Sequence, residues 1–440
     1  MSPSDPKPSV CIDAFNIALP EGSGIATYGR NLLTNLKSLG HTTSVLYGPQ
    51  AGRSQDPVLN EVALVDAVPP TKGRSKAFRN VVRRFTDLGL GRSAFPVPPT
   101  GEVIWPRSGG GRPDTEMFWS SRRLFEDANQ RFRASRRTTD VTFQAGTASP
   151  DLVHWTTVLP LRAPGRPNIY TIHDLIPLRL PHTTLDNKRA FLAMCRRIVR
   201  DADRIAVVSE ATRRDVVRLL GAPEDKVVTT YQSVSIPQEA LSRSVDDAAR
   251  DLEGMFGLGW KNFFLYFGAI EPKKNLARII EGHLASGTRA PLVVIGGRAW
   301  LSDKETALLK TVQQRLKNAD SRILHLDYLP YSMLMTLVRG ARATLFPSLY
   351  EGFGLPVLES MMLGTAVLTS TAGSLPEVAG DAALLVDPYD ANAISAGIRR
   401  LDHDADLRGD LEVRGREQAA RFSEAAYQVR LSELYAPFGR

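Results

Sequence analysis

The chain has 440 residues, of which 43% are hydrophobic, and its formal net charge is +8. One hydrophobic core rarely spans more than about 250 to 300 residues, so this length predicts a protein of two domains. The first ten residues, MSPSDPKPSV, lack the pattern of a secretory signal, and no stretch reaches the roughly 18 apolar residues of a membrane-spanning helix. We therefore expect a cytoplasmic protein, whose two cysteines, Cys11 and Cys195, favour buried thiols over a disulfide framework.

Apolar strands alternate with amphipathic helices along most of the chain. In the first half, the pattern predicts strands at 10–14, 43–47, 152–155, 169–173, 204–208 and 226–230, and helices at 25–39, 184–200 and 211–220. In the second half, it predicts strands at 263–267, 292–295, 322–326, 343–346, 366–369 and 384–386. This alternation predicts an α/β protein with two Rossmann-like, doubly wound domains that face a central cleft.

The polar stretch at 238–259 lacks a strand and is the predicted domain boundary. We expect a first domain at 1–245 and a second domain at 246–425. Residues 426–440 are expected to form a terminal helix that could cross back to the first domain. Because ligands of such sheets bind beyond the carboxyl ends of the strands, we expect the active site in the cleft between the domains.

Residues 71–140 interrupt this pattern as a basic insertion in the first domain. They contain 15 lysines and arginines against 7 acidic residues, a net charge of +8 that equals that of the whole chain. Three interpretations stay open: peripheral contact with an anionic membrane on the inner face of the plasma membrane, binding of a phosphate-bearing acceptor, or a solvated lid. Nucleic acid is disfavoured because the charge is local and no nucleic-acid module is recognisable. The segment also carries the aromatic residues Phe78, Phe85, Phe95, Trp105, Phe118, Trp119, Phe125 and Phe132.

The loop at 20–28, PEGSGIATY, joins the first predicted strand to the first predicted helix. Gly22 and Gly24 would let the backbone approach a substrate, and the following helix N-terminus adds positive potential. The loop has no third glycine in dinucleotide register, so it is not a nicotinamide or flavin fingerprint. A structural turn and a substrate loop remain equally good explanations of the residues alone.

His173 and Asp174 follow the strand Ile169-Tyr-Thr-Ile172. A histidine there could bond to a sugar hydroxyl while Asp174 fixes its ring, although a lone histidine is usually structural. Further along the chain, Lys273 and Lys274 form a turn before a predicted helix, where a lysine can supply a point charge to a diphosphate. Exposed lysine pairs, however, are often only solvated.

Glu351 and Glu359 flank a glycine-containing turn, EGFGLPVLE. The first acid follows a predicted strand, and the second lies in a helix that begins near Pro356. Gly352 and Gly354 leave room for backbone amides to approach a ligand, and the helix N-terminus favours an anionic group. Taken alone, both acids could also be ordinary helix caps.

This segment resembles the E-x7-E signature of the retaining, nucleotide-sugar-dependent glycosyltransferases of the GT-B fold classified as family 4. The resemblance continues at 364–370, 374–381 and 383–388, and at 267–276, which is similar to the turn that carries the family's phosphate-binding lysine. Within the family, the chain looks most like the mannosyltransferase branch of bacterial surface polysaccharide assembly.

The resemblance implies a role for each candidate residue. Glu359 would hold the ribose, Glu351 and His173 would face the donor sugar as catalytic residues, and Lys274 would bind the phosphates. Lys273 would share that charge, because Ala269 stands where many members have an arginine. The remaining donor contacts would come from Gly352, Phe353, Gly354, Leu355 and Gly24.

The implied reaction transfers a hexose, with mannose favoured, from a GDP- or UDP-linked sugar to a saccharide or lipid-linked saccharide. It would retain configuration by front-face attack and would need neither a metal nor another cofactor. Metal-dependent transferases use a D-x-D pair, and Asp201-Ala-Asp203 and Asp402-His-Asp404 read instead as caps or solvated turns. The competing hypotheses are a nucleotide-sugar epimerase of the same fold, a phosphorylase, which would need a pyridoxal lysine that we do not find, and a catalytically silent scaffold.

Overall fold

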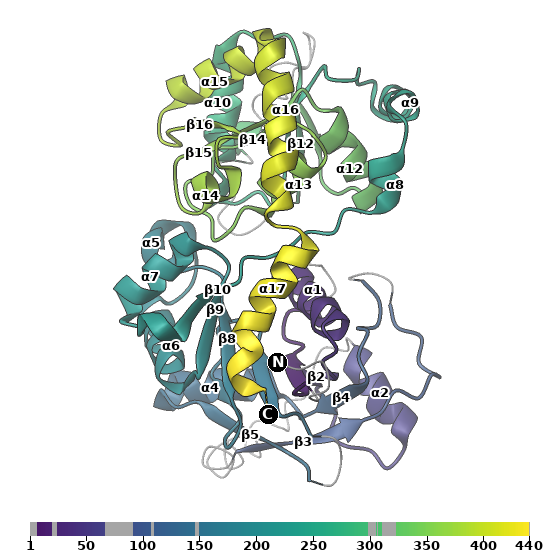
Figure 1. The fold of residues 1–440 in the computed structure, drawn as a ribbon, viewed down its shortest axis with the longest axis vertical. Helices are drawn as coiled ribbons and strands as arrows, with labels where there is room; N and C mark the ends of the chain where they lie inside the picture. Colours follow the sequence, from purple (N-terminus) through teal and green to yellow (C-terminus); the bar gives the residue numbers. More distant parts are fainter. Residues whose placement is uncertain are drawn as a thin grey trace.

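The computed structural model describes residues 7–19, 24–66, 91–106, 110–145, 149–297, 305, 307–309 and 323–439. Within these residues, the strands form two separate sheets, one of ten strands and one of six. Each sheet is the centre of one α/β domain, and Figure 1 shows the two domains one above the other. The predicted architecture of two Rossmann-like domains is confirmed.

The first sheet has the strand order β10-β9-β8-β6-β1-β2-β4-β3-β5-β7. Its neighbouring strands pair in parallel except β3 and β4, which are antiparallel. The strands are β1 (Val10–Asp13), β2 (Thr43–Tyr47), β3 (Arg92–Val97), β4 (Met117–Ser120), β5 (Thr139–Phe143), β6 (Leu152–Trp155), β7 (Leu161–Arg162), β8 (Asn168–Ile172), β9 (Arg204–Val207) and β10 (Val227–Thr229). Its main helices are α1 (Gly24–Ser38), α2 (Pro57–Val65), α4 (Leu124–Ser135), α5 (Ile176–Arg179), α6 (Lys188–Asp201) and α7 (Glu210–Leu220).

The described part of 71–140 contributes strands to the first sheet that the sequence did not predict. β3 and β4 lie inside the first sheet, and the side chains of Phe118 and Trp119 on β4 are fully buried. Trp105 stacks on Phe118 with ring centroids 5.1 Å apart. β3 and β4 were not predicted because each is too short to show a clear alternation of apolar and polar residues. The glycines and prolines around them suggested loops instead. Residues 71–90, with Phe78 and Phe85, lie outside the described residues.

The second sheet is parallel throughout, with the order β13-β12-β11-β14-β15-β16. Its strands are β11 (Phe264–Phe267), β12 (Leu292–Ile295), β13 (Ile323–Leu326), β14 (Ala343–Phe346), β15 (Val367–Ser370) and β16 (Leu384–Val386). The sequences FLYF of β11 and LVVI of β12 are buried at every position, as expected of strands covered by helices on both faces. The helices are α8 (Gln238–Ser242), α9 (Val245–Phe256), α10 (Leu276–Ser286), α12 (Tyr331–Gly340), α13 (Leu355–Met362), α14 (Leu375–Ala379), α15 (Ala391–His403) and α16 (Ala405–Ala420).

Each predicted strand lies within one residue of an observed strand at both ends. One predicted helix begins four residues late, at Lys188 instead of 184, because the side chain of Asn187 accepts a hydrogen bond from the Ala190 amide and caps α6 there. The polar stretch at 238–259 forms α8 and α9, which pack on α12 of the second domain. The chain therefore passes from the first sheet to the second between β10 and α8.

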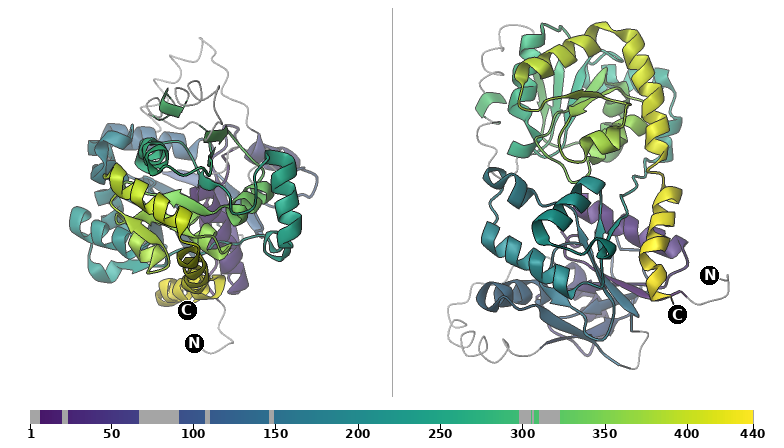
Figure 2. Two further views of the ribbon diagram at one scale, coloured as in Figure 1. Left: turned by 90° about the horizontal axis from the view of Figure 1, so that it is seen from above. Right: turned by 60° about the vertical axis from the view of Figure 1, so that its left-hand side comes forward.

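The chain returns to the first domain in its last helix, α17 (Glu424–Tyr435). Figures 1 and 2 show α17 continuing from α16 and lying along the first domain beside α1. Its Tyr435 hydroxyl contacts Nδ1 of the buried His154, whose Nε2 lies 2.7 Å from the Thr171 hydroxyl. His154 is therefore held between α17 and β8, in the packing of the first domain. In the described part of the chain, no helix is long and apolar enough to cross a membrane.

Candidate active site

Glu351 lies in the turn after β14 and is only 7% exposed. The loop after β15 supports this turn, because the Ser374 hydroxyl lies 3.0 Å from the carbonyl oxygen of Glu351 and 2.7 Å from that of Phe353. Gly373 has a φ of 61°, and a Cβ there would lie 2.8 Å from the Glu351 carbonyl oxygen. A larger residue would push the turn away. The backbone around Glu351 is therefore fixed by its neighbours.

The turn after β11 carries the two predicted lysines in a short 3-10 helix, η4 (Pro272–Lys274). It ends at Asn275, which has a left-handed conformation with a φ of 66°. The side-chain amide of Asn275 donates to the carbonyl oxygens of Pro347, at 2.8 Å, and Pro388, at 2.7 Å. These bonds tie the lysine turn to the Glu351 turn, so that two loops far apart in the sequence form one unit.

Lys274 and Glu351 form an ion pair in which Nζ lies 2.6 Å from Oε1. Lys273 lies 3.8 Å from the other carboxylate oxygen of Glu351 and 3.4 Å from Glu271. Burial opposes ionisation of Glu351, but the two ammonium groups outweigh it and hold its pKa below the usual value. Burial raises the pKa of Glu271 despite the same lysines. Burial opposes the charge of Lys273, yet the surrounding carboxylates raise its pKa.

The glycine turn after Glu351 lies against the first domain. A Cβ at Gly352 would clash with the carbonyl oxygen of His173 from the first domain, so the close approach requires glycine. Gly354 has a φ of 107° and precedes Leu355, the first residue of α13. A Cβ at Gly24, the first residue of α1, would lie 3.8 Å from the Leu355 side chain. Gly352 and Leu355 of the second domain therefore lie close to His173 and Gly24 of the first domain.

Glu359 lies on α13, where its carboxylate accepts a hydrogen bond from the Tyr331 hydroxyl at 3.3 Å. The residue is partly exposed, but burial of its carboxyl group raises its pKa to about 7, an effect that the bond from Tyr331 opposes. Within the described residues, no ion pair links Glu359 to a cation. Glu359 is therefore not part of the ion-paired cluster of Lys273, Lys274 and Glu351. A separate position of this kind suits contact with a different part of a ligand.

His173 is held by groups of its own domain. Its Nε2 lies 2.8 Å from the carbonyl oxygen of Thr156, and the ring of Tyr28 packs edge-on against it with centroids 4.8 Å apart. Burial lowers the pKa of His173, and a carbonyl oxygen only accepts, so the neutral ring carries its hydrogen on Nε2. The expectation that Asp174 fixes the ring is wrong, because the Asp174 carboxylate accepts instead from the backbone amide of Ile176.

The ring of Phe353 is buried among other aromatic rings. The ring is 3% exposed and packs against Tyr231 and Phe422, with centroids 6.4 and 5.5 Å away. These two aromatic residues lie on the two segments that cross between the domains. A ligand in the cleft would therefore meet Phe353 through its backbone. The remaining part of the predicted glycine loop, residues 20–23, lies outside the described residues.

Both D-x-D pairs have structural partners. Asp201 and Asp402 pair with arginine side chains, and Asp203 and Asp404 accept hydrogen bonds from backbone amides. Within the described residues, no group of three or more histidine, cysteine or acidic side chains has an arrangement suited to a metal ion.

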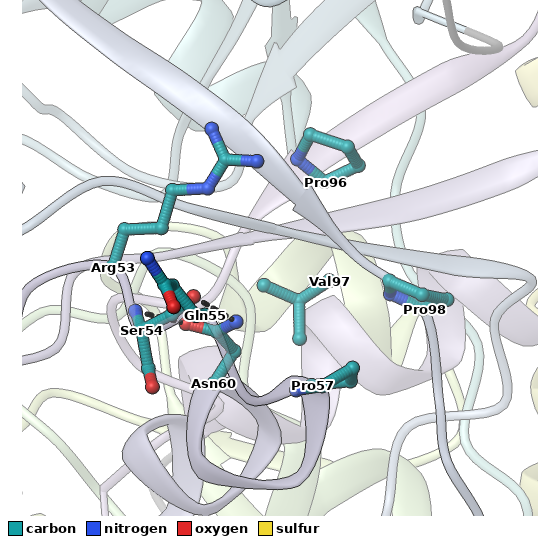
Figure 3. A pocket seen from close by; sticks show the side chains of 8 residues that line it. All are labelled: Arg53, Ser54, Gln55, Pro57, Asn60, Pro96, Val97 and Pro98. Carbon is teal, nitrogen blue, oxygen red and sulfur yellow. Dashed lines mark hydrogen bonds between the residues drawn. The ribbon is translucent and has the colours of Figure 1, made fainter.

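A separate pocket lies in the first domain between the loop after β2 and strand β3 (Figure 3). Its polar groups are largely occupied with one another, because Asn60 bonds to the backbone amide and carbonyl of Ser54. The pocket contains none of the predicted site residues and no carboxylate. Its lining consists of Arg53, Ser54, Gln55, Pro57, Asn60, Pro96, Val97 and Pro98.

Several supporting residues could not be assigned from the sequence. Asn275 was part of a recognised motif, and the preference of asparagine for left-handed backbone was the available signal. Glu271 and Ser374 also lie inside recognised motifs, but the sequence suggested no function for either side chain. Thr212, whose hydroxyl donates to the His173 carbonyl oxygen at 3.1 Å, gave no local signal because the contact is long-range.

Two family models match the chain. The model of glycosyl transferases group 1 matches residues 257–428, and the model of glycosyltransferase family 4 matches residues 102–236. A curated relative, the O-antigen chain mannosyltransferase B of Escherichia coli, is 34% identical over 260 residues. That match covers 58% of this chain and 66% of the relative, so the chain spans slightly less than two thirds of the relative's length.

Two solved structures share the fold over nearly the whole chain. Sucrose-phosphate synthase from Thermosynechococcus elongatus has a TM-score of 0.66 at 16% identity and matches 98% of this chain and 99% of its own. Anabaena HepE in complex with UDP-glucose has a TM-score of 0.63 at 14% identity and matches 98% of this chain and 100% of its own. Together with the two family models, the fold and the motif positions identify this chain as a member of the family 4 glycosyltransferases of the GT-B fold.

Proposed function

We propose that the chain is a retaining transferase that moves a hexose, with mannose favoured, from a GDP- or UDP-linked sugar to a saccharide or lipid-linked saccharide during polysaccharide assembly. The observation that carries this proposal is the ion-paired cluster of Lys274, Lys273 and Glu351 at the ends of β11 and β14. The mannosyltransferase name of the Escherichia coli relative supports the sugar, and the UDP-glucose complex of the Anabaena neighbour supports a nucleotide sugar as donor.

The lysines have a defined task in this reaction. Breaking a sugar–phosphate bond leaves a nucleoside diphosphate, whose growing negative charge must be stabilised in the transition state. Lys274 and Lys273 supply fixed positive charge, and the backbone amides from Gly352 to Leu355 supply donors at the start of α13. These groups support a reaction without a metal ion.

The carboxylates take the other roles. Glu359, on α13, would accept hydrogen bonds from the ribose hydroxyls. Glu351 is held ionised by its two lysines, so its negative charge would stabilise the oxocarbenium-like sugar as the bond to phosphate breaks. His173, with its hydrogen on Nε2, would offer Nδ1 as an acceptor to a donor-sugar hydroxyl. The acceptor would enter beside Gly24.

A lipid-linked acceptor would bring the protein to a membrane surface. Within the described part of 71–140, such a contact would depend on the exposed arginines around the end of α4, because the aromatic residues of β4 are in the core. This contact would be electrostatic and would weaken with salt.

Ligand-observed NMR of the purified chain tests the proposal. The ligands are GDP-mannose, UDP-glucose, UDP-N-acetylglucosamine and the free nucleotides, each with and without a chelator. We expect selective binding of one donor that the chelator leaves unchanged and that Glu359→Gln weakens. Binding of none of them would favour a catalytically silent scaffold, and binding that the chelator abolishes would contradict the metal-independent site.

A further inference from the structure

The N-terminus of α7 in the first domain receives a carboxylate from the second domain. Glu377 on α14 accepts from the backbone amide of Glu210 at 2.7 Å and from that of Ala211 at 3.1 Å. The next amide, that of Thr212, donates to the capping hydroxyl of Ser209 at 3.0 Å. The first turn of α7 is therefore fully capped, but two of its three bonds come from the other domain.

The same turn of α7 contacts both halves of the proposed active site. The Thr212 hydroxyl lies 3.1 Å from the carbonyl oxygen of His173 and 3.4 Å from that of Gly352. His173 belongs to the first domain, and Gly352 directly follows Glu351 in the second. One hydroxyl group therefore contacts the backbone of His173 and the backbone of the residue that follows Glu351.

Glu351 is also connected to α7 on each side of its turn, once through its neighbour Tyr350 and once through the loop that carries Ser374 and Glu377. One turn along the helix, Asp215 accepts a hydrogen bond from the Tyr350 hydroxyl at 2.5 Å. On the other side, Glu377 is three residues from Ser374, whose hydroxyl supports the backbone of Glu351 and Phe353. The positions of Glu351 and α7 are thus linked on both sides of the turn.

We propose that Glu377 is a positioning residue whose docking on the N-terminus of α7 sets the separation between His173 and Glu351. This inference rests on the proposed function for its effect on turnover. A carboxylate suits the position because both of its oxygens accept, and because the helix N-terminus favours negative charge. A glutamine at this position keeps one oxygen that accepts a hydrogen bond. Its amide nitrogen, however, is only a donor and would face a backbone N–H group, which is also a donor, so the second hydrogen bond would be lost.

The residues proposed to bind the nucleotide and its phosphates, Lys273, Lys274 and Glu359, lie within the second domain. Among the residues that the structure describes, Lys273, Lys274 and Glu359 form no hydrogen bond or ion pair with α7, and the glycine turn remains supported by Gly373 and Ser374. Nucleotide affinity should therefore not depend on Glu377, whereas any step that needs both domains should.

The first test compares Glu377→Gln and Glu377→Ala with Glu417→Gln, a control at an exposed acid on α16. We expect kcat to fall between about 10-fold and 100-fold in the Glu377 variants, as for other small misplacements of catalytic groups, with unchanged affinity for GDP and UDP. The control should match the wild type. Wild-type kcat in both Glu377 variants, or a parallel loss of nucleotide affinity and kcat, would overturn the inference.

A second variant removes the backbone N–H group that donates the hydrogen bond, rather than the Glu377 carboxylate that accepts it. Ser209 has an extended backbone with φ of −162° and ψ of 160°, which allows proline at the next position, and the first position of a helix tolerates proline. Glu210→Pro therefore removes the amide that meets Glu377 while keeping α7. We expect it to lower kcat in the wild type and to have no further effect in Glu377→Ala. Additive losses would contradict a direct link.

The geometry can be tested without turnover. Spin labels at Arg189→Cys on α6 and Asp406→Cys on α16, both exposed positions in different domains, report the distance between the domains. Glu377→Ala should broaden or lengthen the distance distribution relative to the same labels in the Glu417→Gln background. An unchanged distribution would overturn the positioning role. If the wild type transfers no sugar, the proposed function fails while this measurement still decides whether Glu377 holds the domains.

Discussion

Lys274 and Glu351 follow different strands of the second sheet, yet Nζ of the lysine lies 2.6 Å from Oε1 of the glutamate. The contact arises because β11 and β14 are neighbours in a parallel sheet, so that their carboxyl ends open into the same loops. Asn275 then joins the two loops by bonding to the Pro347 carbonyl. The pair holds a positive and a negative charge in defined places, which is what departure of a phosphate from a sugar requires.

Lys274→Met should weaken donor binding and lower the stability of the fold. It removes a cation from the diphosphate site and leaves Glu351 with the more distant Lys273. Loss of a hydrogen bond to a charged group predicts a decrease of about 1.5 to 3 kcal/mol in the free energy of unfolding, measured by urea titration. Lys37→Met is the control, since its pair with Asp114 is exposed to solvent and should contribute little to the free energy of unfolding. Equal decreases in both variants would contradict a buried, functional pair.

Glu351→Gln should affect turnover more than binding. The substitution keeps the shape of the side chain but removes the negative charge that would stabilise the sugar cation. We expect kcat to fall by roughly 10²- to 10³-fold, the usual cost of one electrostatic group at a reaction centre, while nucleotide affinity changes little. Steady-state kinetics and calorimetry separate the two quantities. Loss of affinity without loss of kcat would assign Glu351 to donor binding alone.

Glu351 also makes stability depend on pH. Its pKa in the folded state lies below its ordinary value of 4.5, so the folded state binds fewer protons than the unfolded state in that range. Its contribution is present above the ordinary pKa and is lost as the pH falls through the lower, folded-state pKa. Glu351→Gln should therefore flatten the acid side of the curve of unfolding free energy against pH. An unchanged curve would show that the ion pairs of Glu351 with Lys273 and Lys274 do not stabilise the folded state.

Glu359 predicts a pH dependence of donor binding. Its pKa of about 7 means that the carboxylate becomes ionised from about pH 6 to about pH 8, and an ionised acceptor binds hydroxyl groups more strongly. Donor affinity should rise over this range in the wild type and stay flat in Glu359→Gln. Stability should change the other way, because a raised folded-state pKa makes the fold less stable as the pH rises from 4.5 to about 7. Identical pH profiles of wild type and variant would remove Glu359 from the donor site.

Phe118→Ala should destabilise the first domain rather than release the protein from membranes. The ring is fully buried and stacks on Trp105, so its removal should cost about 3 to 5 kcal/mol in unfolding free energy. Sedimentation with anionic vesicles should be unchanged as long as the variant is folded. Loss of vesicle binding from a folded variant would restore the view that these aromatic residues contact lipid.

The sequence predicted the second domain better than the first. The strands of the second sheet are short apolar runs between clear turns, and the motifs at their ends stay together because a parallel sheet brings those ends to one edge. The strands β3, β4, β5 and β7 were missed because they are short and lack a clear pattern, and because a proline interrupts β3. In the site, Lys274 and Glu351 were predicted individually, but the bonds of Asn275 and Glu377 could not be, since both depend on which loops meet in three dimensions.

The most direct test of the proposed function is sugar transfer itself. The purified chain is incubated with GDP-mannose or UDP-glucose and a set of saccharide and lipid-linked saccharide acceptors, and the products are analysed by mass spectrometry. The account predicts an acceptor extended by one hexose together with an equal amount of free nucleoside diphosphate, and roughly 10²- to 10³-fold slower formation of both products with Glu351→Gln at the same protein concentration. Release of nucleoside diphosphate without an extended acceptor, or consumption of no nucleotide sugar at all, would contradict it.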